Sequence, residues 1–183
     1  MRWVQIGAAS HLHFRLTKTL GWMDLIGQTS IRDVLQLIYH CDGVLCPVTF
    51  AMHATAAVPI KTPPFAFPET LPPSAPENLR PGAPLRPCVV LAGGREPAHW
   101  ERYPGMRFLE NVGSLPCCSY GGCWRSRAHK IGDGDKKDTE HLCLNPVQHG
   151  DWTFARCQEM LTPTMISDAI LDFYRGGALS WPM

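Results

Sequence analysis

The sequence predicts an α/β fold with a parallel sheet and a cysteine-rich metal-binding appendage. Short apolar runs that end in glycine or proline alternate with segments of helical period, as strands joined by crossover helices do. Beyond them, residues 116–156 have no sustained period but hold four of the eight cysteines, and a fifth follows at position 157. A segment without an apolar core needs another source of stability, and clustered thiols point to a metal ion.

Length and charge restrict the classes of protein to which the chain can belong. A chain of 183 residues is long enough for one core with a small appendage. Its 17 basic and 16 acidic residues nearly cancel, so we expect no nucleic acid partner. No apolar run reaches the roughly 18 residues of a transmembrane segment, and the first residues do not resemble a signal peptide. We therefore expect a cytoplasmic protein, in which cysteines seldom form structural disulfides.

The first predicted elements are one short strand and one capped helix. Residues 3–7 form an apolar run closed by glycine, which predicts a buried strand followed by a turn. Residues 11–23 have no clear period, and we expect a loop with at most a short helix. Ser30 and Asp33 make a capping pair for a helix over residues 30–40, whose apolar positions repeat at helical spacing.

A second strand and helix follow in the same order. Residues 43–47 read as a buried strand, and residues 49–58 as an alanine-rich helix that can pack closely on a sheet. Residues 59–87 contain so many prolines that neither a helix nor a strand ladder can continue, which predicts an extended surface loop. Residues 88–92 restore a buried strand, and residues 93–95 turn the chain at its carboxyl end.

These elements predict a Rossmann-like, doubly wound sheet in residues 1–115, with a short final strand at residues 106–109. The cysteine-rich segment takes residues 116–161. The chain then closes with a helix over residues 162–177, in which Thr162 caps the start and proline takes the first helical position. We expect this helix to pack back on the sheet through its apolar face, formed by Ile166, Ala169, Ile170 and Phe173.

The cysteines of the segment are the candidate metal ligands. Thiolates are soft, charged donors that bind zinc or iron well, and four of them on one ion replace a missing apolar core. The predicted ligands are Cys118, Cys123, Cys143 and Cys157, with Cys117 as an alternate. A histidine of the same stretch can stand in for one of them, the candidates being His129, His141 and His149. The other interpretation is that these thiols are free or disulfide-bonded. The remaining cysteines have apolar surroundings that indicate core positions: Cys41, Cys46 and Cys88.

A second candidate site lies where the predicted strands end. Parallel sheets bind ligands at the carboxyl ends of their strands, and helix N-termini attract phosphate groups. Three such ends occur in the sequence, at Gly7, at Thr49 and at the turn that contains Gly94 and Arg95. Thr49 and His53 can hydrogen-bond a diphosphate, and Arg95 can neutralise its charge. Taken singly, a histidine on an alanine-rich helix is more often a core residue, and a Gly-Gly-Arg stretch is more often an ordinary turn.

Three stretches of the chain resemble the C-terminal lobe of family 9 glycosyltransferases, the ADP-heptose transferases of bacterial lipopolysaccharide synthesis and their relatives. These stretches are residues 27–32 (GQTSIR), 48–57 (VTFAMHATAA) and 88–97 (CVVLAGGREP). The resemblance covers residues 3–103 and implies the donor-binding lobe of an inverting GT-B enzyme. Such an enzyme transfers a sugar, heptose in that family, from a nucleotide diphosphate sugar to a glycan or protein acceptor.

The resemblance also implies which residues contact the nucleotide sugar. Thr49, Met52 and His53 take the places of the family's serine or threonine, methionine and histidine. Val48 and Phe50 stand where the family has aspartate and glycine, so the contact with the sugar is expected to differ. The complete predicted set of nucleotide-binding residues is Gly7, Thr29, Thr49, Met52, His53, Gly94 and Arg95.

The cysteine-rich tail is similar in kind to the four-cysteine, iron-binding finger of autotransporter heptosyltransferases. This similarity favours a structural metal ion, iron or zinc, that lies outside the donor cleft. GT-B enzymes bind the acceptor, and usually hold their general base, in an N-terminal lobe. We therefore expect that lobe as a partner, predict no catalytic residue in this chain, and expect the isolated chain to bind a nucleotide weakly and catalyse little. The alternative function is a non-enzymatic, metal-stabilised module that binds a partner protein.

Overall fold

The chain has a mixed α/β fold whose central sheet contains three parallel strands. The structure is a computed structural model that describes residues 2–11, 13, 15–16, 21–59 and 86–174. The central strands are β3 (Val44–Pro47), β4 (Cys88–Gly93) and β5 (Met106–Glu110). Strand β4 lies between the other two, in the order β3-β4-β5. Each of these strands lies where the sequence predicts it.

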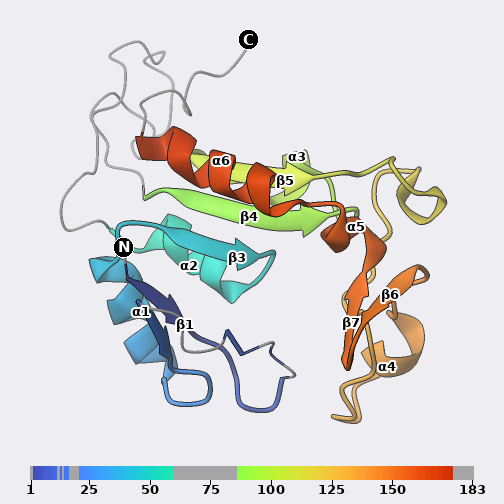
Figure 1. The fold of residues 1–183 in the computed structure, drawn as a ribbon, viewed down its shortest axis with the longest axis horizontal. Helices are drawn as coiled ribbons and strands as arrows, with labels where there is room; N and C mark the ends of the chain where they lie inside the picture. Colours follow the sequence, from blue (N-terminus) through green and yellow to red (C-terminus); the bar gives the residue numbers. More distant parts are fainter. Residues whose placement is uncertain (1, 12, 14, 17–20, 60–85, 175–183) are drawn as a thin grey trace.

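Helices cover both faces of the central sheet. Successive residues of β4 point to opposite sides, so they pack against different helices. On one face, Cys88 and Val90 pack with Met52 of α2 (Phe50–Ala57) in a buried cluster. On the other face, Val89 packs with Ala169 and Phe173 of α6 (Pro163–Tyr174). Figure 1 shows α6 lying along β4 and β5. The return of the last helix to the sheet, predicted from its apolar face, is therefore confirmed.

The N-terminal residues form a second, smaller parallel sheet, in which β1 (Trp3–Gln5) pairs with β2 (Trp22–Asp24). The prediction of a buried strand over residues 3–7 is wrong in extent and burial, since the strand is shorter and Val4 is 42% exposed. Strand β2 falls in the stretch where no strand was expected. Its three residues are too few to display a period of two, and the stacked rings of Trp3 and Trp22, 5.4 Å apart, hold the pair together.

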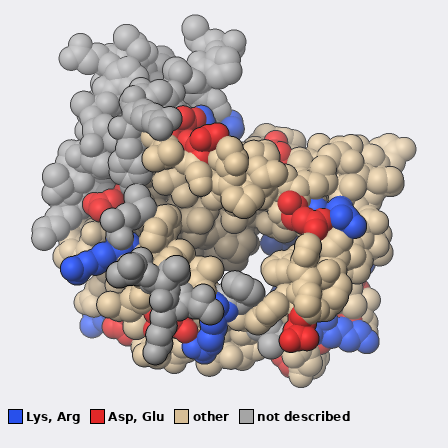
Figure 2. Space-filling view, viewed as in Figure 1, with Lys and Arg blue, Asp and Glu red and all other residues tan. Residues whose placement is uncertain are grey.

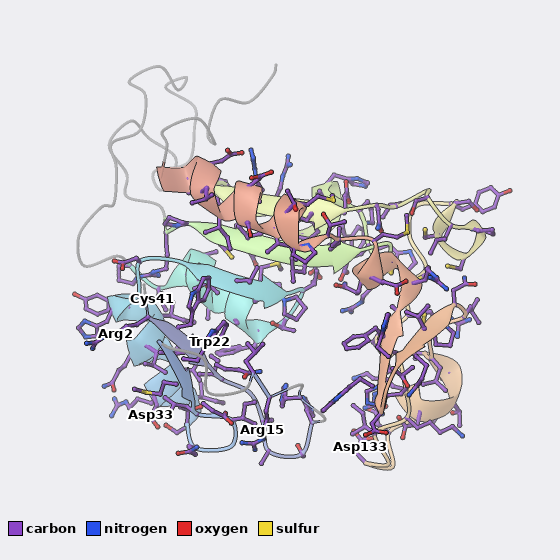
Figure 3. The ribbon with its side chains drawn as sticks, viewed as in Figure 1. Arg2, Arg15, Trp22, Asp33, Cys41 and Asp133 are labelled. Atoms are coloured by element: carbon purple, nitrogen blue, oxygen red, sulfur yellow. The ribbon has the colours of Figure 1, made fainter. Side chains whose placement is uncertain are left out.

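Helix α1 (Ile31–His40) begins with the predicted capping box. The Ser30 side chain accepts a hydrogen bond from the Asp33 backbone N–H, and the Asp33 carboxylate accepts one from the Ser30 N–H at 2.8 Å. Figure 3 places Asp33 and Cys41 at opposite ends of this helix. The helix predicted over residues 49–58 is also confirmed, as α2. Most of the proline-rich stretch and the glycines after the last helix lie outside the described residues.

A buried arginine ties together the two chain ends that flank residues 60–85. Arg86 is 5% exposed, and its guanidinium donates hydrogen bonds to the carbonyl oxygens of Val58 and Pro59, each at 3.1 Å. A third bond, of 3.3 Å, reaches the carbonyl oxygen of Tyr39 in α1. The ends of α1 and α2 and the start of β4 are thereby fixed to one another.

The cysteine-rich segment contains short regular elements that the sequence did not predict. They are the 3₁₀ turn η2 (Pro116–Cys118), the helices α4 (Lys137–Glu140) and α5 (Arg156–Glu159), and a hairpin of β6 (Pro146–His149) and β7 (Trp152–Ala155). A short helix, α3 (Ala98–Glu101), precedes β5. Figure 1 shows the segment at the end of the molecule toward which the arrows of β3 and β4 point. None of the helices in the described ranges has both the length and the apolar character that a bilayer-spanning helix needs.

Candidate metal and anion site

One cavity of about 360 Å³ lies at the carboxyl edge of the central sheet. Thr49 after β3, and Gly94 and Arg95 after β4, form part of its lining. The other wall belongs to the cysteine-rich segment and includes Cys117, Cys118, Cys123, Cys143 and Cys157. Figure 2 shows this face of the molecule hollowed between the sheet and the segment. The predicted metal ligands therefore share this cavity with three of the predicted nucleotide-binding residues, Thr49, Gly94 and Arg95, whereas a metal ion outside the donor cleft was expected.

Backbone contacts hold the segment against the sheet edge. The Cys123 N–H donates to the Gly94 carbonyl oxygen at 3.1 Å, and the Trp124 N–H donates to the Arg95 carbonyl oxygen at 2.9 Å. Gly94 has no room for a side chain, because a Cβ there would lie 2.9 Å from the Cys118 sulfur. On the far side of the turn, the Gln158 side chain donates to the carbonyl oxygen of Leu91 in β4 at 3.1 Å.

The five thiols differ in burial but share an environment. All eight cysteines lie in described residues and are free thiols. Cys118 is fully buried and Cys157 is 8% exposed, whereas the other three are half-buried. Burial is the largest cause that raises the pKa of the Cys123, Cys143 and Cys157 thiols, and negative charge on neighbouring cysteines raises each pKa further. The five sulfur atoms are thus close enough to influence one another electrostatically.

The donor set fits zinc or iron in its chemistry. Five soft thiol ligands around one cavity supply more than the four positions that a tetrahedral structural site needs. In the described ranges, however, no group of three or more His, Cys, Asp or Glu side chains is placed closely enough to hold a metal ion. Ligation therefore requires the cysteine side chains to turn toward a common point in the cavity.

The three histidines offered as alternative ligands have different surroundings. His149 is already paired, with its Nε2 atom 2.5 Å from a carboxylate oxygen of Glu159. His141 is exposed. Both ring nitrogens of His129 are buried and have no hydrogen-bond partner among the described residues. His129 does not line the cavity, although its neighbour Ala128 does. Of the three, only His149 has a side-chain partner among the described residues, and none of them lines the cavity.

Two of the three predicted core cysteines occupy core positions, whereas Cys41 does not. Cys46 and Cys88 are 6% and 0% exposed and pack in the cluster beneath α2. A hydrogen bond with Cys46 and burial raise the pKa of the Cys88 thiol, so it stays protonated. Cys41 is half-buried at the end of α1, where its thiol contacts the Ile38 carbonyl oxygen at 3.3 Å.

The N-terminus of α2 is open to an anion, whereas that of α1 is not. Thr49 occupies the N-cap of α2 without a side-chain capping bond, and the first turn of this fully described helix has no acidic residue. Its free N–H groups therefore leave a partial positive charge beside the cavity. At α1, the Asp33 carboxylate already lies over the helix start. Thr29 precedes this neutralised terminus and does not line the cavity.

The remaining predicted nucleotide residues lie away from the cavity. Met52 is completely buried, since it faces inward from α2 into the core. His53 is exposed, and its Nδ1 atom lies 2.9 Å from the hydroxyl group of Tyr103. The Gly7 carbonyl oxygen accepts a hydrogen bond from the Gly27 N–H at 2.8 Å within the N-terminal sheet region. The structure thus brings Thr49, Gly94 and Arg95 to the four predicted metal ligands, but not Gly7, Thr29, Met52 or His53.

Arg95 is oriented by a buried carboxylate. Glu96 is 2% exposed, and one of its oxygens lies 3.4 Å from the Arg95 Nε atom. Burial raises the pKa of Glu96, and the adjacent guanidinium partly offsets that effect. Neither Glu96 Oε1 nor Arg95 Nε makes a hydrogen bond within the described part of the chain. The ion pair anchors one side of the guanidinium and leaves its outer nitrogens available to a ligand.

Three further arginines line the cavity and were missed by the sequence analysis. They are Arg125, Arg127 and Arg156, all from the cysteine-rich segment. No aspartate or glutamate is among the described residues that line this space, so its charged side chains are all cationic. Two of them have a signal in the sequence, the stretch Cys123-Trp124-Arg125-Ser126-Arg127. In this stretch two arginines follow a predicted metal ligand at every second position.

Arg127 holds the far end of the segment together. Its guanidinium is 2.7 Å from Asp133 and also pairs with Asp138. The Asp138 carboxylate accepts hydrogen bonds from the Ile131 N–H at 2.9 Å and the Gly132 N–H at 2.7 Å. These backbone bonds, with Arg127, lower the pKa of Asp138 to about 2. Figure 3 shows Asp133 at the tip of the segment, away from the sheet.

The lowered pKa of Asp138 predicts a pH-dependent contribution to stability. Since the folded-state pKa lies below the ordinary value of 3.8, this contribution is complete above that value and is lost as the pH falls through about 2. Asp138→Asn should therefore lower the melting temperature at pH 5, and the difference from the parent protein should shrink at pH 2. Asp168→Asn, which alters an exposed carboxylate on α6, is the control. A difference that is the same at both pH values contradicts the assignment.

Comparison of the chain with protein-family models, with curated proteins and with solved structures finds no match in any of the three.

Proposed function

We propose that this chain is the Rossmann-like, nucleotide-sugar-binding lobe of a glycosyltransferase. In this proposal it works in the cytoplasm with an N-terminal, acceptor-binding lobe and transfers a sugar, heptose by family resemblance, to a glycan or protein acceptor. The observation that carries the proposal is the cavity at the carboxyl edge of β3 and β4, whose lining includes the uncapped start of α2 and four arginines. Crevices at this edge of a parallel sheet are where α/β folds bind nucleotides.

The residues of the cavity suit a diphosphate. The free N–H groups after Thr49 supply directed donors with a partial positive charge. Arg95 supplies a planar guanidinium whose outer nitrogens can bind two phosphate oxygens at once. Gly94 lets the backbone and the segment approach closely without a side chain between them. These groups bind and orient the donor, and no group of this chain is assigned a proton transfer.

The cysteines support a structural role for a metal ion in this proposal. Iron or zinc would be held by Cys118, Cys123, Cys143 and Cys157, which come from separate turns of the segment. When bound, such an ion cross-links these turns and substitutes for an apolar core. Cys118 contacts the sheet edge at Gly94, so the cross-link would also fix the segment to β4.

A thermal-shift titration of the purified chain with ADP, UDP and GDP tests the proposal. We expect at least one of them to raise the melting temperature at millimolar concentration, and the matching monophosphate to act more weakly. Arg95→Gln should weaken binding about tenfold, since a hydrogen bond to a charged group is worth about 1.5–3 kcal/mol. Arg32→Gln, an exposed arginine on α1, is the control and should bind like the parent chain.

Two results would contradict parts of the proposal separately. If none of the three diphosphates alters the melting temperature, this chain is not a donor-binding lobe by itself. If elemental analysis of protein purified without chelator finds neither iron nor zinc, the cysteines are free thiols and the metal assignment fails.

Exposed aromatic side chains favour one alternative, a non-enzymatic metal-stabilised module that binds a partner protein. Tyr120 is 98% exposed, Trp100 is 64% exposed and Trp124 is 43% exposed, and the two tryptophan rings contact each other edge to face. Large aromatic groups are enriched at protein interfaces. This alternative requires that a chelator abolish partner binding while nucleotide diphosphates have no effect.

A further inference from the structure

The charges that line the cavity are not equally available to a ligand. Arg127 is surrounded by Asp133, Asp135 and Asp138, so its charge is already balanced. Arg156 pairs with Glu159 at 2.6 Å. Figure 2 shows the same pattern over the visible face, with acidic and basic groups side by side.

Arg125 differs from the other arginines of the segment in its partner. Its Nη1 atom donates to the backbone carbonyl oxygen of Glu140, which is a neutral acceptor. In the described part of the chain it forms no ion pair with a carboxylate. Because its partner is neutral, the Arg125 guanidinium keeps its full positive charge. No carboxylate among the described residues that line the cavity balances this charge, so it is available to an anionic ligand.

We infer that Arg125 is an anion-binding residue of this cavity, so that the cysteine-rich segment forms the second wall of the diphosphate site. The inference rests on the proposed function and extends it. Arg95 would approach the phosphate groups from the sheet and Arg125 from the segment, since both line the same cavity. The segment thus takes part in recognition as well as in stability.

This arrangement couples metal binding to anion binding. Arg125 lies two residues after Cys123, whose backbone N–H is bonded to Gly94. The segment has few buried apolar residues of its own, mainly Val147 and Leu161 besides its cysteines. A metal ion that fixes Cys123 therefore also fixes Arg125, and each ligand should strengthen the binding of the other by the same factor.

Calorimetric titration of the zinc-loaded chain with ADP and with inorganic pyrophosphate tests the role of Arg125. Arg125→Gln should weaken both about tenfold or more, and Arg125→Lys, which keeps the charge, should recover part of the loss. Lys130→Gln removes one exposed cation of the same segment outside the cavity lining and should leave the affinity unchanged. Equal affinities of the Arg125→Gln and Lys130→Gln proteins overturn the inference while the proposed function stands.

A cobalt(II) titration tests the coupling without any measurement of activity. Thiolate ligation gives cobalt(II) a visible absorption, which reports metal binding directly. We expect saturating ADP to tighten cobalt binding, and removal of the metal to weaken ADP binding by the same factor. Unchanged or weakened cobalt binding in the presence of ADP overturns the coupling. If the parent chain binds neither ADP nor pyrophosphate, the inference and the donor-binding function fail together.

Discussion

Gly122→Ala is expected to lower the free energy of unfolding by about 3 to 5 kcal/mol and to detach the cysteine-rich segment from the sheet edge. Gly122 has a backbone φ of +107°, a conformation that residues with a side chain rarely adopt. An added Cβ would also overlap the carbonyl oxygen of Arg95. That oxygen belongs to the backbone and cannot swing aside. The hydrogen bonds of Cys123 and Trp124 to the β4 turn follow directly and should be lost.

Gly121→Ala is a matched control for this substitution. Gly121 also has a positive φ, of +82°, but an added Cβ would meet nothing within 4 Å. It should cost only the strain of the left-handed backbone, about 1–2 kcal/mol. Denaturant unfolding measures both variants, and hydrogen exchange of the Cys123 and Trp124 amides reports detachment. Equal losses for the two variants would show that Gly122 does not press on the sheet edge.

Met52→Ala is expected to lower the free energy of unfolding by about 2 to 5 kcal/mol without altering nucleotide affinity. Met52 is 0% exposed and packs against Cys88 and Val90 beneath α2, so its removal leaves a cavity in the core. The family resemblance instead implies that it contacts the donor. Denaturant unfolding measures the first quantity, and calorimetric titration of the folded variant with ADP measures the second.

Met165→Ala provides the comparison, because Met165 is 45% exposed on α6. It should change stability by less than about 1 kcal/mol, as surface substitutions generally do. If Met52→Ala instead lowers the affinity for ADP and leaves stability unchanged, Met52 contacts the ligand and does not contribute to the core beneath α2.

Elements with strong local signals were predicted correctly from the sequence. Ser30 and Asp33 mark the start of α1 with a reciprocal cap, and Thr162 followed by proline marks the start of α6. Strand β4 is apolar along its length because both of its faces are covered by helices. In each case the determining contacts lie within the element or follow from its own pattern.

The elements that were missed depend on partners far along the chain or are too short to show a period. Strand β2 is held by three residues of β1, nearly twenty positions earlier. The β6–β7 hairpin turns at Gly150 and Asp151, a pair that favours hairpins, but its flanking strands have only four residues each. Neither strand alternates clearly between apolar and polar residues, so the turn residues alone did not predict the hairpin.

The candidate site was predicted in part for a similar reason. Thr49, Gly94 and Arg95 follow from the rule that parallel strands end at a common edge. The rule cannot reveal which later segment folds over that edge, so the arginines of the cysteine-rich segment were missed. Met52 was assigned by family resemblance alone, and the inward face of α2 places it in the core.

The hydrogen bonds of Arg86 have a consequence for how the elements around the central sheet stay aligned. Val58 and Pro59 directly follow α2, and Arg86 lies just before β4, where its guanidinium binds both carbonyl oxygens. The same guanidinium binds the carbonyl oxygen of Tyr39 in α1. One side chain therefore joins three parts of the chain that are far apart in sequence. A substitution at this one position removes all three bonds at once, so the alignment of α1 and α2 with the start of β4 depends on a single residue.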